Sequence, residues 1–180
     1  MNGRMPGQGP AVLFLLCMGC SPTKEAPDSG GRVSPFVLAA NAWRPGDVAE
    51  SPFATHPRAN EECNPVAYQE EDGFFEVQTD FCPFGVFVQA IGQAAGQGEV
   101  LRFTFWHLDL WAAEPAEAQV ALWVDSAEIW SRRIPIPGPE DVVVVEHPAP
   151  LGLTAGESAW LLVTNHGLNS YRLGDVSLVP

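Results

Sequence analysis

The stretch FEVQTDF at residues 75–81 alternates apolar and polar side chains without a break. In an extended chain the odd-numbered residues share one face, and the polar residues Glu76, Gln78 and Asp80 share the other. This period of two predicts a β-strand with one buried face and one wet face. The stretch QVALWVD at residues 119–125 alternates in the same way and predicts a second strand.

Short strands separated by turns account for most of the chain after residue 35. Glycine and proline mark turns such as those at 96–98 and 137–139. The valine run at 142–145 predicts a strand covered on both faces, and one helical turn is plausible at 112–118. Many short strands at regular spacing predict an all-β fold, a single antiparallel β-sandwich of the jelly-roll type. The nine predicted strands are 36–42, 73–81, 84–91, 99–110, 119–125, 128–134, 141–147, 158–165 and 170–179.

The N-terminal residues have the order of an export signal. An apolar run at 11–18 ends in Gly19-Cys20, after which the chain turns polar. A membrane span needs about 20 apolar residues, so this shorter run suits a signal peptide. A small residue followed by Cys resembles the lipobox of bacterial lipoproteins, although Cys17 stands where that family usually has Leu. The resemblance implies cleavage before Cys20 and acylation of its thiol, with palmitate as a typical acyl group.

This resemblance implies three parts. They are a signal peptide at 1–19, the lipidated cysteine with a flexible tether at 20–35, and the β-sandwich domain at 36–180. The implied location is a bacterial membrane, and the outer membrane is favoured because Ser21 stands where an Asp would indicate inner-membrane retention. Ordinary cleavage, which would give a soluble secreted protein, is the alternative.

The chain is strongly acidic, with 22 acidic and 9 basic residues and a formal net charge of −13. Nucleic acid and anionic membrane surfaces would repel such a protein, so the composition argues against both as direct partners. A membrane partner is therefore expected through the lipid alone.

The cysteines predict one disulfide. If Cys17 leaves with the leader and Cys20 carries the lipid, Cys63 and Cys82 remain. Two cysteines in an exported domain usually pair, and two thiolates are too few for a zinc site. A Cys63–Cys82 bond would require the segment between them to fold back beside the strand at 73–81.

The second half of the chain has a distinctive order of strands and turns. A strand at 100–110 is followed by VALWVD at 120–125, an Ala-Gly-Glu turn at 155–157 and a closing strand, RLGDVSL, at 172–178. This order resembles the second half of a galactose-binding-like jelly roll, the fold of many carbohydrate-binding modules. The resemblance implies a sandwich and carbohydrate as the ligand class. It also places Asp175 where some related modules have an acid that binds a structural calcium, with an ordinary exposed acid as the alternative.

Two polar side chains interrupt an apolar strand face. His107 and Asp109 are two residues apart and share the face of Phe103 and Phe105. Such a pair can contact a ligand, hold a metal or act as a general base. A hydrogen-bonded polar pair at the end of the strand is the simpler alternative.

Further candidate ligand contacts lie in a turn and on two aromatic positions. Asn165 and His166 precede Gly167 between the last two predicted strands, and they could join His107 if those strands are neighbours. The simpler interpretation is a turn in which Gly167 adopts a positive φ. Trp111 and Trp123 share faces with polar residues and are candidate platforms for sugar rings, with burial in the core as the alternative.

The sequence is compatible with three classes of function. The first hypothesis is a non-catalytic binding module for carbohydrate or another small polar ligand. The second is a structural or protein-interaction domain of the cell envelope with no small-molecule site. A hydrolase using His107 and Asp109 is the third, but the sequence contains no Gly-x-Ser-x-Gly, Ser-x-x-Lys or phosphate-binding loop. We therefore expect no enzyme and no cofactor other than the calcium implied at Asp175.

Overall fold

The computed structural model describes residues 35–165 and 167–180. All of them belong to one compact unit, Arg32–Pro180. The predicted signal peptide, Cys20 and nearly all of the predicted tether lie outside the described residues. No helix in the described part of the chain is long and apolar enough to cross a bilayer.

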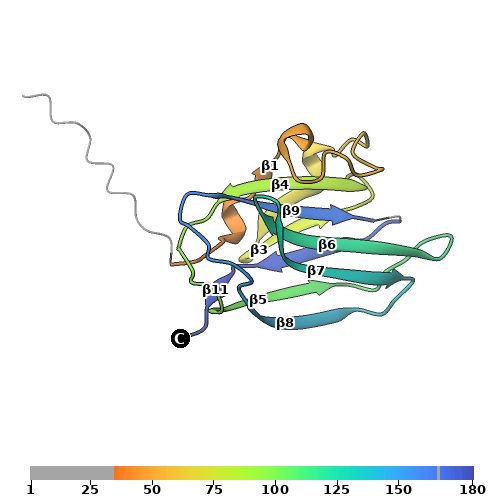
Figure 1. Cartoon of the computed structure of the whole chain (residues 1–180). Helices are drawn as coiled ribbons and strands as arrows, with labels where there is room; N and C mark the ends of the chain where they lie inside the picture. The colour runs from red at the N-terminus through yellow and green to blue at the C-terminus, as the bar shows by residue number, and fades with distance from the viewer. Residues whose placement is uncertain (1–34, 166) are drawn as a thin grey trace, which may run out of the picture. The chain divides into compact units, whose positions relative to one another are not determined.

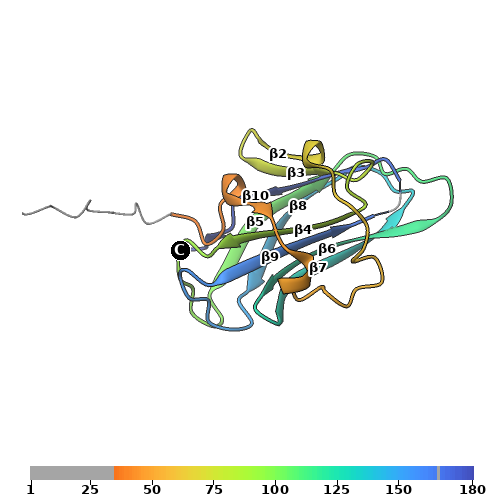
Figure 2. The same ribbon diagram turned by 90° about the horizontal axis from the view of Figure 1, so that it is seen from above.

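Two antiparallel sheets lie face to face, which confirms the predicted all-β sandwich (Figures 1 and 2). The five-stranded sheet has the order β1-β4-β9-β6-β7, with bounds Arg44–Pro45, Phe84–Ala90, Ser158–Thr164, Ala116–Val124 and Ala127–Ile136. In the six-stranded sheet, β5 (Val100–His107) pairs with β8 (Asp141–Pro148) on one side and with β10 (Ser170–Gly174) and β11 (Ser177–Leu178) on the other. The sheet continues through β3 (Phe74–Gln78) to β2 (Tyr68–Glu71). Three short 3-10 helices are η1 (Ala40–Ala42), η2 (Val48–Glu50) and η3 (Pro65–Ala67).

The hydrophobic core lies between the sheets and follows the predicted alternation. Phe75 and Val77 of β3 are 3% and 1% exposed and face β6, whose Val120 is 1% exposed. Aromatic rings fill the centre, where Phe75 meets Phe87 edge to face with 4.9 Å between ring centroids. Because this core and the disulfide fall within residues 35–180, the segment contains what its own folding needs.

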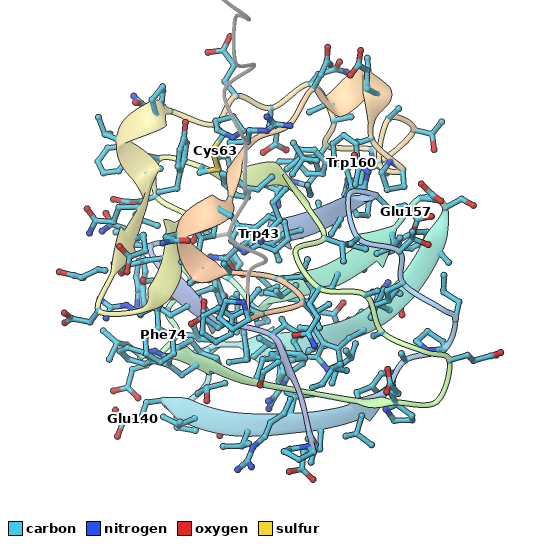
Figure 3. The ribbon with its side chains drawn as sticks, turned by 90° about the vertical axis from the view of Figure 1, so that its left-hand side faces the viewer. Trp43, Cys63, Phe74, Glu140, Glu157 and Trp160 are labelled. Atoms are coloured by element: carbon cyan, nitrogen blue, oxygen red, sulfur yellow. A yellow bond between two sulfur atoms is a disulfide. The ribbon has the colours of Figure 1, made fainter. Side chains whose placement is uncertain are left out.

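A second apolar cluster covers the outer face of the five-stranded sheet. Residues 46–62, which we call the covering segment, place Phe53 against the sheet, where its ring meets Trp123 edge to face at 5.6 Å. Gly46 lets the backbone of the covering segment pack against the ring of Trp160, because a Cβ at position 46 would lie 2.7 Å from that ring. Figure 3 shows Trp160 beside this segment. The part of this face formed by β4 and β9 is therefore buried by the chain itself.

The predicted disulfide is confirmed and anchors the C-terminal end of the covering segment. Cys63 and Cys82 are bonded, with 4.0 Å between their Cα atoms (Figure 3). As expected, the segment between them folds back, since β2 pairs antiparallel with β3. The Asn64 N–H also donates to Phe81 O at 2.9 Å, so covalent and hydrogen bonds fix the same point.

Two predicted strands differ from the structure because of one contact between the ends of the domain. Residues 36–42 form a single bridge and η1, and the predicted strand at 170–179 is broken into β10 and β11. The cause is Val176, whose N–H donates to Leu38 O at 2.8 Å and whose carbonyl accepts from Leu38 N. Asp175 then accepts a hydrogen bond from the Ala40 N–H at 2.7 Å, where the chain turns into η1.

Two other predictions were wrong for reasons of packing. The helical turn expected at 112–118 is a loop, and β6 begins at Ala116. The valine run is not covered on both faces, because Val142 and Val144 are 67% and 54% exposed. β8 is the last strand of its sheet, so only Val143 and Val145 face the neighbouring layer. β1 and β2 are short strands that the sequence pattern did not predict.

Candidate functional site

The candidate site lies at one end of the sandwich, where two loops meet. The loop from β5 to β6 and the turn from β9 to β10 reach the same end of the molecule (Figure 1). Asn169 joins them: its Oδ1 accepts from the Trp111 N–H at 2.7 Å and its Nδ2 donates to Trp111 O at 3.1 Å. Because Asn169 is only 6% exposed, a buried amide fixes the backbone of Trp111.

Gly167 makes this close contact of the loops possible. It has the positive φ, 116°, that the turn pattern predicted. A Cβ at this position would lie 2.2 Å from Trp111 O, so any other residue would push the loops apart. The turn and the Trp111 loop are thus built as one unit.

Two hollows open beside the fixed loop. The larger, of about 580 Å³, is mainly apolar and lies against Trp111. The smaller, of about 230 Å³, has mostly polar residues in its lining, among them Asp80 and Asp109. Leu168 lines both hollows. The remaining residues are Ala112, Ala113, Glu114, Pro115, Ala116 and Gly167 around the larger hollow, and Gln78, Leu108, Asn169 and Ser170 around the smaller one.

Exposure distinguishes this end of the molecule from an ordinary loop region. Trp111 is 58% exposed, although its main chain is held on both sides, and Leu168 is 65% exposed. Asp109 is exposed too, and its Oδ1 accepts from the Glu140 N–H at 2.9 Å, which fixes the carboxylate against the start of β8. An exposed indole on a fixed backbone, near carboxylates, suits a ligand with an apolar face and several hydroxyl groups.

The structure places His107 behind this surface. It is 2% exposed and faces the core, where its ring meets those of Phe105 and Tyr171 at 6.0 and 5.9 Å. Its Nδ1 lies 2.9 Å from Leu108 O, while its Nε2 and the Tyr171 hydroxyl have no hydrogen-bond partner among the described residues. Burial raises the pKa of Tyr171. His107 therefore lines neither hollow, and Asp109 lies beyond the strand on the surface.

Asn165 stabilises the turn of the site through hydrogen bonds from a buried position. It is fully buried, and its Nδ2 donates to Thr79 Oγ1 at 2.5 Å and to Gly167 O at 3.3 Å. The main-chain carbonyl of Asn165 accepts a hydrogen bond from Arg58 Nη1 at 2.8 Å, which links the covering segment to this turn. Asn165 thus holds the turn in place, and His166 lies outside the described residues.

Trp123 lies elsewhere, on the outer face of the five-stranded sheet under the covering segment. It is half-buried, and its Nε1 has no hydrogen-bond partner in the described part of the chain. Nearby, His56 stacks on Phe84 with 4.9 Å between ring centroids. Burial lowers the pKa of His56, and the charge of Arg58 lowers it further. The covering segment packs over the aromatic face around Trp123, whereas the side chain of Trp111 is exposed to solvent.

The calcium ion implied at Asp175 stays a prediction. The Oδ1 of Asp175 accepts from the Ala40 N–H, and within residues 35–165 and 167–180 no group of three or more His, Cys, Asp or Glu side chains could hold a metal. Calcium takes six to eight oxygen ligands. The visible role of Asp175 is to fix the start of η1.

Comparisons with known proteins were made with the sequence and with the fold. No protein-family model matches the chain, and no curated protein matches it. The similar solved structures include carbohydrate-binding modules and one catalytic domain. A CBM4 module is 12% identical over 78% of this chain and 88% of that chain, with a TM-score of 0.44. The N-terminal cellulose-binding domain of Cellulomonas fimi β-1,4-glucanase C is 13% identical over 62% and 81%, with a TM-score of 0.40. A CBM61 module, solved with β-1,4-galactotriose, is 11% identical over 66% and 85%, with a TM-score of 0.35.

Proposed function

We propose that this protein is a non-catalytic carbohydrate-binding domain whose ligand occupies the two hollows beside Trp111. The observation that carries the proposal is the exposed indole of Trp111 on a backbone that Asn169 holds at both its N–H and its carbonyl. Because the backbone is fixed, only the side-chain torsions of Trp111 lose freedom when a ligand stacks on its ring, so less of the contact energy is offset.

The arrangement of the hollows supports a sugar as the ligand. The C–H face of a pyranose ring would lie on Trp111 in the apolar hollow. Its hydroxyl groups would donate to Asp80 and Asp109 in the polar hollow, since ionised carboxylates act only as acceptors. Leu168, which lines both hollows, would cover the edge of the ring.

Replacing Trp111 by alanine tests this proposal. We expect Trp111→Ala to weaken binding to glycans selected on an array by about tenfold or more, because stacking and apolar contact are lost. The melting temperature should stay the same, since the indole is exposed. Val66→Ala is the control, because Val66 is also exposed, at 71%, and lines neither hollow. Equal affinity of Trp111→Ala and the wild type would refute the site.

We further propose that a lipid on Cys20 holds the domain at a bacterial membrane. The support is the apolar run at 11–18 followed by Gly19-Cys20 in the sequence. Cys20→Ala should abolish incorporation of labelled fatty acid and move the protein from the membrane to the soluble fraction. Labelling that persists in the variant, or a wild type that is soluble after export, would contradict the anchor.

A further inference from the structure

The four edge strands of the sandwich differ in how they are protected. Exposed sheet edges invite pairing with other chains, and short length, charge and proline prevent it. β1 has two residues and includes Pro45, and β2 has four residues with exposed Glu70 and Glu71. β7 is longer, but Arg133 and Pro135 interrupt it. Three of the four edges are therefore blocked.

β8 is neither short nor interrupted by an internal proline, and its charged residues are Asp141 and Glu146 near its two ends. It pairs with β5 over eight residues without a register shift, and in the described part of the chain it has no ladder on its other side. Figure 1 shows it as the outermost strand of its layer. The sequence DVVVVEHP contains no lysine, and its one proline is the last residue. The exposed Val142 and Val144 lie side by side on its outer face.

Backbone hydrogen bonds show which peptide groups of β8 face the free edge. Just beyond the strand, the Ala149 N–H donates to Glu99 O at 2.8 Å, so in this register the odd-numbered residues of β8 bond to β5. On β5, the even-numbered Val100 turns its carbonyl the other way, to the N–H of Val179. The even-numbered residues of β8 therefore direct their peptide groups outward. They are Val142, Val144 and Glu146.

We propose that β8 pairs antiparallel with β8 of a second copy of this chain and joins the two six-stranded sheets into one. Two copies of β8 can exchange hydrogen bonds only through the N–H and C=O groups that point to the free edge, which belong to even-numbered residues. An even-numbered residue of one copy must therefore lie opposite an even-numbered residue of the other, and the side chains of such a pair lie on the same face. A twofold axis at Val144 satisfies this rule. It opposes Val144 to itself and Val142 to Glu146 of the second copy, which covers the whole strand.

Charge favours this register over the one with its axis at Val143. With the axis at Val144, Asp141 opposes His147 of the second copy, and no two like charges are directly opposed. With the axis at Val143, Glu140 would oppose Glu146, and like charges in this position destabilise a sheet. The chain already places Arg132 at 2.6 Å from Asp141 and Arg102 at 3.6 Å from Glu146, so both acids are partly neutralised. The strand is complementary to itself.

Two lysine substitutions test the partner and the register together. Val144→Lys places two lysines opposite each other at the axis and should raise the dissociation constant of the dimer about tenfold, by charge repulsion and loss of the valine contact. Val142→Lys, at the more exposed position, places lysine opposite Glu146 and should leave the dimer unchanged or tighter. The measurement is sedimentation equilibrium of residues 35–180 over a concentration series. Circular dichroism confirms that each variant is folded.

Cysteine capture provides a second readout that does not depend on charge. In the proposed register Val144→Cys faces its own copy at a separation that a disulfide can bridge, whereas Val142→Cys does not. Oxidation should link the first variant into a dimer and leave the second monomeric. A wild type that stays monomeric at every concentration would overturn the proposal. Equal loss of the dimer in both lysine variants, or equal cross-linking of both cysteine variants, would overturn it too.

Discussion

Replacing Phe53 by alanine is expected to lower the free energy of unfolding by about 3–4 kcal/mol. Phe53 is 6% exposed and is the large apolar side chain that the covering segment places on the sheet. Its removal deletes the edge-to-face contact with Trp123 and leaves a cavity that the segment, anchored at its end by the disulfide, has little freedom to fill. Urea denaturation followed by tryptophan fluorescence measures the change.

Val66→Ala is the control for this prediction, because Val66 follows the covering segment in the chain but is 71% exposed. It should change the free energy of unfolding by less than about 0.5 kcal/mol. A loss below about 1 kcal/mol for Phe53→Ala would contradict the close packing of the covering segment on the five-stranded sheet.

The free energy of unfolding of the double variant Cys63→Ala/Cys82→Ala should be about 3 kcal/mol lower than that of the wild type. The disulfide closes a loop with a sequence separation of 19, and opening it restores entropy to the unfolded chain. Reduction of the wild type with dithiothreitol should produce a similar loss, whereas the double variant should not respond to the reductant. Equal stability of the reduced and oxidised wild type would show that the bond does not constrain the fold.

The strands of the fold followed from local periodicity, because a period of two reports directly which face is buried. The alternation at 75–81 and 119–125 predicted β3 and β6 and the sides that face the core. The valine run of β8 misled, since its composition suits a central strand while its position at the sheet edge depends on tertiary pairing. The position of the covering segment could not be predicted either, because residues 46–62 show no apolar period and are ordered by their contacts with the sheet.

The candidate site was predictable only in its exposed parts. Trp111 and Asp109 were candidates from the sequence, and both line the hollows. Asn169 was not a candidate, because its contact with Trp111 joins positions 58 residues apart. Asp80 belonged to the wet face of a predicted strand, and nothing in its neighbourhood distinguished it from other surface acids. Long-range side-chain contacts of this kind leave no local pattern.

The most direct test of carbohydrate binding at this site is a titration followed by the tryptophan indole signals in a ¹H–¹⁵N spectrum. The chain has six tryptophans, and each indole N–H gives its own signal. On addition of a glycan selected by array, the signal of Trp111 should shift with saturation, while that of Trp123, under the covering segment, should stay in place. A saturable shift of Trp123 with an unchanged Trp111, or no shift of any indole with every array glycan, would contradict the account.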